Sequence, residues 1–126
     1  MMLVRSGVKL LKYYLDIPRD EQRRRLAERA GDPLTQWKSS QIDAKALKRW
    51  KDYTRARDAM LERTHAAFAP WHIVLAADKK AARINLIRDI LYRLHYDGKD
   101  ERLTRPDGKV VFEFEEACLR DGRLAE

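Results

Sequence analysis

Residues 8–17 read VKLLKYYLDI and are closed by Pro18. The apolar run is nearly continuous, which is typical of a strand buried on both faces of a parallel sheet. Residues 71–76, WHIVLA, form a second short run of the same kind after Pro70. Because a long helical stretch separates the two runs, they are expected to be parallel strands joined by a crossover. The predicted fold class is α/β and helix-dominated, with a partial parallel sheet of two core strands.

The stretch between the strands carries the signals of two helices. Acidic residues after Pro18 predict a helix start, and Gly31-Asp32-Pro33 predicts its end. This helix is polar on almost every side, so we expect it to bridge solvent or to cover something charged. Ser40 and Asp43 resemble a capping box before a long helix over about 43–64. The apolar stripe of that helix comprises Leu47, Trp50, Tyr53, Met60 and Leu61.

The chain after the second strand is expected to hold one more helix and a charged tail. Asp78 can cap a helix that ends near His95. Its apolar stripe comprises Ile84, Ile87, Leu91 and Leu94. In the tail, Val110, Phe112 and Phe114 alternate with polar residues, which predicts either an edge strand or a docking arm.

These elements predict a single partial domain over 1–126. It comprises a helix end and core strand (1–17), a helical lid module (18–64), a second core strand with its helix (65–96) and a charged tail (97–126). Two strands cannot bury both faces of a sheet. We therefore expect the chain to be part of something larger or to pair with another chain. Its exposed sheet edge favours either association, with a homo-oligomer as one form, or poor solubility.

The charge of the 126 residues is +7, and it is unevenly distributed. Residues 19–63 hold thirteen Lys or Arg and eight Asp or Glu, a net charge of +5. This excess favours anionic partners and places them in the middle third. Cys118 is the single cysteine and cannot form an internal disulfide, which indicates a reducing, cytoplasmic location. No apolar run approaches the roughly 20 residues of a membrane span, so no membrane association is expected.

Searches for catalytic motifs find no match. The sequence has no G-x-x-x-x-G-K-[ST], no G-x-G-x-x-G and no G-x-S-x-G. Three histidines, His65, His72 and His95, and one cysteine stand at unrelated spacings, so no metal site is predicted and the histidines are interpreted as structural. No residue of this chain is predicted to be catalytic.

The basic segment offers a candidate binding site. Arg25 and Arg29 are four residues apart and share a helix face, and Lys38 follows in the loop. Guanidinium groups form forked, charge-assisted bonds with phosphate oxygens, so this segment suits a polyanion. A solvated charged face is the alternative. Trp37 and Trp50 could likewise stack on bases or serve only in packing.

Seven segments in order resemble the second half of the polyphosphate kinase 2 family. They are GVKLLKYYLDI (7–17), EQRRRLAER (21–29), DPLTQWK (32–38), RWKDYTRARDAMLERT (49–64), APWHIV (69–74), ADKKAARINLIRDIL (77–91) and RPDGKVVFEF (105–114). The resemblance implies a P-loop-kinase-like fold. It also implies an enzyme that moves phosphoryl groups between inorganic polyphosphate and a nucleoside mono- or diphosphate, ADP or AMP, with GDP or GMP as further substrates. Nucleic acid is not an expected partner.

The resemblance also assigns roles to residues. By the family pattern Arg25, Arg29 and Lys38 bind phosphates from the lid. Asp78, Lys79 and Arg83 match positions near the nucleotide, with helix capping and solubility as the alternative interpretation. The family implies Mg²⁺, whose ligands are expected outside this chain together with the Walker A loop and the Walker B aspartate.

Two departures from the family pattern are visible. Gln41 stands where the family usually has proline. Residues 2–4, MLV, match an interior helix of the family, so the chain is expected to be a natural truncation, a product of a misplaced start or a fragment. Without a P-loop it is expected to be inactive alone. The alternatives are a non-catalytic basic module for polyphosphate or nucleic acid, and a subunit that docks on a full-length homologue.

Overall fold

A small mixed sheet forms the centre of the protein. The computed structural model describes residues 2–126, with Ala44 described by its backbone alone. The strands lie in the order β1-β2-β3, with β1 parallel and β3 antiparallel to β2. The elements are α1 (Met2–Arg5), β1 (Lys12–Asp16), α2 (Arg19–Gly31), the 3₁₀ helix η1 (Gln36–Lys38), α3 (Gln41–Ala46), α4 (Trp50–Thr64), β2 (Trp71–Leu75), α5 (Lys79–Arg93), α6 (Glu101–Thr104), β3 (Val111–Glu113) and the 3₁₀ helix η2 (Glu116–Leu119).

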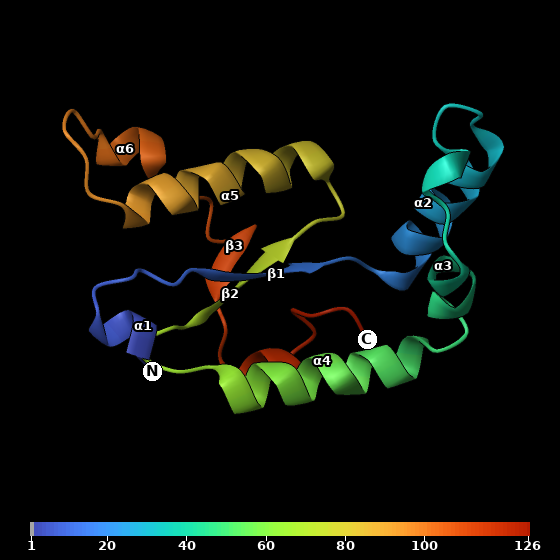
Figure 1. Cartoon of the computed structure of the whole chain (residues 1–126), viewed down its shortest axis with the longest axis horizontal. Coiled ribbons are helices and arrows are strands. Elements are labelled where there is room, and N and C mark those ends of the chain that lie inside the picture. The colour runs from blue at the N-terminus through green and yellow to red at the C-terminus, as the bar shows by residue number, and fades with distance from the viewer. Residues whose placement is uncertain (1) are drawn as a thin grey trace.

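Helices cover the sheet on both faces, α5 on one and α4 with the C-terminal segment on the other (Figure 1). The central strand β2 is fully enclosed at its middle, because Ile73 and Val74 point to opposite faces. Ile73 belongs to a cluster with Leu61 of α4 and Phe114, while Val74 packs with Ala82 of α5. The predicted α/β class and the parallel pairing of the two core strands are confirmed.

The first predicted strand is shorter and more exposed than its sequence indicates. Of residues 8–17 only Lys12–Asp16 pair with β2. The expectation of burial on both faces is wrong, since the side chain of Leu15 in this strand is 51% exposed. The physical reason is that β1 lies at the edge of the described sheet and pairs with β2 alone. In the part of the chain that the structure describes, no second strand with its own covering helix shields the outer side of β1. Of the two interpretations of the tail, the edge strand is confirmed by β3.

The long helix predicted over 43–64 is divided in two. The capping box of Ser40 and Asp43 is confirmed, with both reciprocal bonds formed. Helix α3 then ends, and Arg49 leaves helical geometry at φ −103° and ψ 25°. The Leu47 carbonyl, which a continuous helix would pair with the amide of Lys51, accepts a hydrogen bond from the Arg19 guanidinium at 3.1 Å. A contact with α2 therefore accompanies the break.

The apolar stripe of α5 does not face the sheet. Ile84 and Ile87 are 51% and 57% exposed, and Leu91 and Leu94 are also exposed. The side of the helix toward the sheet instead presents smaller and polar residues, among them Ala82, Asn85 and Asp89, which are buried. Periodicity therefore identified the helix correctly but not the face that this chain buries.

Within the predicted lid module of residues 18–64, α4 packs on the sheet through Leu61, whereas α2 and α3, which we call the lid from here on, contribute almost nothing to the core. Helix α2 has no buried residue along its described length, as its polar sequence predicts. It projects with α3 from one end of the molecule, away from α5 and α4 (Figure 1). Across residues 2–126, no helix combines the length and apolar character needed to cross a bilayer.

Candidate functional site

The lid meets the sheet where the two parallel strands end. Strand β1 leads through Pro18 into α2, and β2 leads through Asp78 into α5. The amide of Ala76 donates to the carbonyl of Asp16 at 2.8 Å, which continues the pairing beyond the strands. In open α/β sheets the carboxyl ends of parallel strands are the usual place of a ligand.

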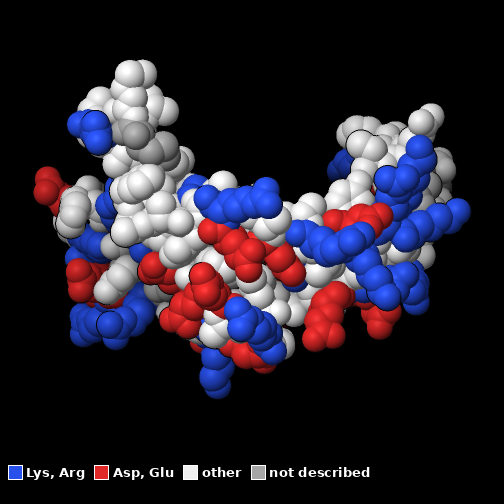
Figure 2. All heavy atoms as spheres, turned by 90° about the horizontal axis from the view of Figure 1, so that it is seen from below, with Lys and Arg blue, Asp and Glu red and all other residues white. Residues whose placement is uncertain are grey.

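A cavity of about 470 Å³ lies at this junction. It is lined by four predicted site residues, Arg25, Arg29, Lys38 and Lys79, which come from α2, η1 and α5. The remaining lining residues are Ile17, Gln22, Leu26, Glu28, Asp32, Thr35 and Asp43. Lysines and arginines gather at this end of the molecule, with carboxylates among them (Figure 2). We call this cavity the lid pocket.

Arg25 connects the lid to the sheet. Its Nη2 donates to the carbonyls of Ala76 and Ala77 at 2.6 and 2.9 Å, and its Nε donates to Glu21 at 2.6 Å. Hydrogen bonds from Arg24 and Arg25 lower the pKa of Glu21 to about 2, so this carboxylate stays ionised near neutral pH. The guanidinium of Arg25 is therefore fixed beside the end of β2.

Arg29 and Lys38 are held more loosely. Arg29 pairs with Asp43 across the lid at 3.2 Å, and both side chains are about one-third exposed. The Lys38 ammonium lies 5.1 Å from the ring centroid of Trp37, an exposed residue. Exposed ion pairs and cation–π contacts are weak, so an anionic ligand could exchange for them at little cost.

The three residues predicted near the nucleotide, Asp78, Lys79 and Arg83, have three different surroundings in the structure. Asp78 caps α5, accepting from the amides of Lys80 and Ala81 at 2.9 and 3.1 Å. Lys79 lines the lid pocket. Arg83 is exposed, one turn further along α5, and does not line the pocket. Capping thus accounts for Asp78 locally, while its role toward a nucleotide stays a prediction.

Sequence reasoning missed a buried charged pair at the end of β1. Asp16 is 4% exposed and accepts from the Ala125 amide at 2.8 Å and from the Arg57 guanidinium at 3.4 Å. Arg57 also pairs with Asp58 at 2.8 Å. Burial raises the pKa of Asp16, against the lowering effect of the Ala125 amide and Arg57. An arginine within the apolar stripe of a predicted helix was the available signal.

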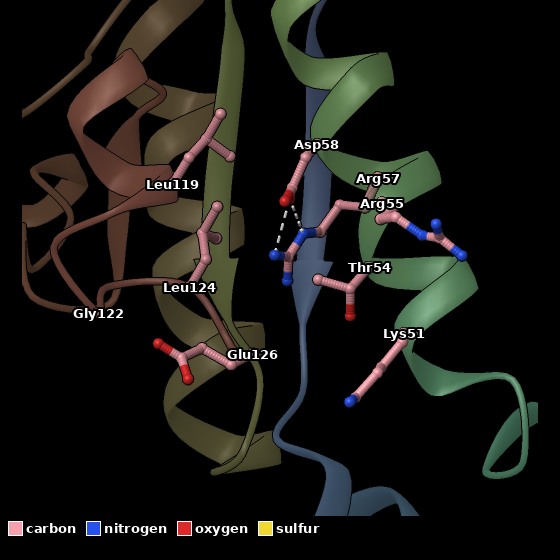
Figure 3. A pocket seen from close by; sticks show the side chains of 9 residues that line it. All are labelled: Lys51, Thr54, Arg55, Arg57, Asp58, Leu119, Gly122, Leu124 and Glu126. Atoms are coloured by element: carbon pink, nitrogen blue, oxygen red, sulfur yellow. Dashed lines mark hydrogen bonds and ion pairs between the residues drawn. The ribbon is translucent and has the colours of Figure 1, made fainter.

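Arg57 borders a separate cavity of about 630 Å³ between α4 and the C-terminal segment (Figure 3). Lys51 and Thr54 extend from α4 on one side, and Leu119 and Leu124 come from the opposite side. The Arg57 guanidinium is already engaged by Asp16, Asp58 and the Ala125 carbonyl. At this cavity Arg57 is therefore a structural residue rather than a free cation.

The described side chains near the lid pocket do not match the ligand set of a magnesium ion. Within residues 2–126, no three or more His, Cys, Asp or Glu side chains lie grouped so as to hold a metal ion. Near the lid pocket, Asp43 is already engaged by Arg29 and by the capping box with Ser40. The described residues do not form a magnesium site by themselves, and the location of the ligands outside this chain stays a prediction.

Comparisons with known proteins identify the family. The family model for polyphosphate kinase 2 matches residues 1–102. The chain is 47% identical over 111 residues to NDP-polyphosphate phosphotransferase 2 of Ruegeria pomeroyi, covering 87% of this chain and 32% of that protein. It is also 47% identical to the GDP-polyphosphate phosphotransferase of Pseudomonas aeruginosa, over 87% of this chain and 31% of that protein.

A solved structure agrees with these sequences. The crystal structure of polyphosphate kinase 2 from Arthrobacter aurescens matches with a TM-score of 0.63 and 40% identity, over 66% of this chain and 30% of that one. The chain spans about a third of the length of the curated relatives that it matches. On these grounds, the chain belongs to the polyphosphate kinase 2 family.

Proposed function

We propose that this chain is the lid-bearing part of an enzyme that transfers phosphoryl groups between inorganic polyphosphate and a nucleoside mono- or diphosphate. ADP or AMP is the expected nucleotide, with GDP or GMP as further candidates. One observation carries the proposal: Arg25, Arg29, Lys38 and Lys79 surround one cavity at the carboxyl ends of two parallel strands. The relatives are named as polyphosphate phosphotransferases for ADP, GDP or NDP.

The contacts of the lid suggest how it would hold phosphates. Arg25 is fixed by the carbonyls after β2 and supplies positive charge from a constant position. Arg29 can leave Asp43 for a phosphate oxygen, because their partly solvated pair is weak compared with a buried one. Lys38 from η1 and Lys79 from α5 add charge from two further elements that line the pocket. Phosphoryl transfer depends on positioning and charge neutralisation, which these groups can provide as the lid closes.

We expect no phosphoryl transfer by this chain alone. Its sequence contains no glycine-rich loop ending in Lys-Ser or Lys-Thr, so the backbone cradle and the lysine that position the transferred phosphate are missing from it. The buried single cysteine fits a reducing compartment, and we place the enzyme in the cytoplasm.

A second candidate is a basic module that binds polyphosphate or nucleic acid without chemistry. The net charge of +5 over residues 19–63 favours it. A third, docking on a full-length homologue, is favoured by the exposed apolar stripe of α5 and the open edge of β1.

Thermal melting separates these candidates. Inorganic polyphosphate should raise the melting temperature at low ionic strength, and high salt should diminish the effect. A single-stranded oligonucleotide of equal charge should produce a smaller shift, since it lacks the compact tetrahedral repeat that the lid pocket suits. Equal shifts of the melting temperature with polyphosphate and with the oligonucleotide would favour the basic module. No shift with polyphosphate would contradict both the phosphate-binding lid and the basic module.

An activity assay completes the test. The chain mixed with polyphosphate, Mg²⁺ and ADP or AMP should form no more product than a blank without protein. Turnover well above the blank would overturn the expectation that the chain is inactive alone. Measuring the mass in solution of the chain, alone and mixed with a full-length homologue, tests docking. If the mixture contains only the two separate proteins and no heavier complex, docking is contradicted.

A further inference from the structure

A third cavity lies at the opposite end of the strands from the lid pocket. It has a volume of about 630 Å³, within the range of small-molecule sites. Residues just before β1 and β2, including Leu11 and Pro70, line it together with the end of α5. The five residues of each strand separate it from the lid pocket by roughly 16 Å. We call it the distal cavity.

Its walls combine apolar groups with positive charge. Val8, Leu11, Phe68 and Tyr92 supply aliphatic and aromatic surface. Lys9 and Arg93 are also lining residues, and no Asp or Glu lines the cavity among the residues that the structure describes. This differs from the lid pocket, where three carboxylates accompany four cations.

The two cations have different surroundings. Arg93 is paired with the buried carboxylate of Asp89 at 2.7 and 3.1 Å, and the Tyr13 hydroxyl also donates to that carboxylate, at 2.5 Å. The Lys9 ammonium donates to the carbonyl of Arg93 and forms no ion pair within residues 2–126. The positive charge of Lys9 is therefore available to an anion beside an apolar surface.

An unsatisfied imidazole borders the same cavity. His72 is 1% exposed, and neither ring nitrogen has a hydrogen-bond partner among the described residues. Burial, with the nearby Arg93 charge, lowers the pKa of His72, so the ring is neutral and offers one donor and one acceptor. Buried polar groups without partners are uncommon and costly. A polar group that reached this imidazole would be stabilised.

We propose that the distal cavity binds a small amphipathic anion, an aromatic or branched apolar body with one carboxylate. The apolar body lies against Phe68 and Tyr92, the carboxylate pairs with Lys9, and His72 donates a hydrogen bond to it. Inorganic polyphosphate does not fit this description because it has no apolar part. The proposal is independent of the function of the lid pocket.

The test is a titration of the whole chain with 3-phenylpropionate, followed through the ring nitrogens of histidine by NMR. Acetate supplies the charge alone and 3-phenylpropan-1-ol the apolar body alone. The Lys9→Gln and Phe68→Ala variants alter exposed lining residues, so the core stays intact. Lys45→Gln and Leu34→Ala are matched controls at exposed lid positions.

We expect saturable binding of 3-phenylpropionate and a shift of the His72 ring signals. The signals of His65, whose Nδ1 accepts from the Trp71 amide, should not move. Lys9→Gln and Phe68→Ala should each weaken binding about tenfold, and the two controls less than about twofold. Equal binding of acetate, equal effects of the controls, or an unshifted His72 would overturn the proposal.

Discussion

The sheet and the lid of this chain are held together by different forces. At the sheet, Ile73 and Val74 of β2 and Leu61 of the helix α4 that covers it are completely excluded from solvent. In the lid, helix α2 buries no residue, and the ties to its surroundings are polar: Arg25 to the carbonyls after β2 and Arg29 to Asp43. Apolar burial therefore stabilises one region, and charged groups position the other.

This difference bears on function because the lid is positioned by the same side chains that we propose bind phosphate. A phosphate chain that takes over Arg29 would loosen its pair with Asp43 while adding new contacts. Ligand binding and lid position are then coupled, whereas the core should be indifferent to the ligand. The predictions below test whether the two regions can be altered separately.

The largest effect is expected for Arg57→Met, which removes the partner of a buried carboxylate. Leaving Asp16 unpaired should cost about 3–5 kcal/mol in the free energy of unfolding at neutral pH. Burial raises the pKa of Asp16 in the folded state above its ordinary 3.8. The folded protein therefore loses stability as the pH rises from 3.8 through the folded-state pKa, where Asp16 ionises. Without Arg57 the folded pKa should rise further.

The deficit of Arg57→Met relative to the unmodified chain should consequently shrink as pH falls toward 4. Urea unfolding at several pH values measures it. A deficit that is the same at acidic and neutral pH would show that Asp16 does not carry the effect. Asp16→Asn together with Arg57→Met should regain part of the loss at neutral pH.

Ile73→Ala tests the core alone. Removing this fully buried side chain should cost about 2–5 kcal/mol by chemical denaturation, through lost burial and the cavity left behind. Ile87→Ala, on the exposed side of α5, is the matched control and should cost less than about 1 kcal/mol. The folded fraction of Ile73→Ala should bind polyphosphate as the unmodified chain does. Weaker binding would mean that core and lid are not separable.

Asp78 separates capping from nucleotide binding at the boundary of the two regions. Asp78→Ala should lose about 1 kcal/mol because two amides of α5 lose their acceptor, whereas Asp78→Ser should lose only a few tenths. If Asp78 also acts near the nucleotide, the serine variant should still weaken ADP binding by calorimetry. An unchanged affinity of Asp78→Ser for ADP would show that Asp78 only caps α5 and does not act near the nucleotide.

The sequence predicted correctly those features that depend on residues close together in the chain. The capping box of Ser40 and Asp43 and the cap by Asp78 are local, so the spacing of a few residues was sufficient. Strand β2 was identified by its apolar run because it is enclosed on both faces. The lid pocket was anticipated in part, since Arg25 and Arg29 are one helical turn apart.

The sequence-based predictions were wrong or incomplete where the local structure depends on residues far away in the chain. The break before α4 accompanies Arg19, and the burial of Arg57 requires Asp16, 41 positions away. Periodicity found α5 but not its buried face, because polar contacts there depend on other elements: Asp89 is satisfied by Tyr13 of β1. Such pairs leave no regular pattern in a single sequence.

The central claim is that the lid pocket, rather than overall basic charge, binds polyphosphate. The most direct measurement is the dissociation constant for polyphosphate of defined length, for Arg29→Gln and for Arg23→Gln. Both residues lie on α2 and both variants remove one charge, but Arg23 is 60% exposed and does not line the pocket. Arg29→Gln should weaken binding about tenfold, and Arg23→Gln less than about twofold. Equal weakening by the two variants would contradict the account.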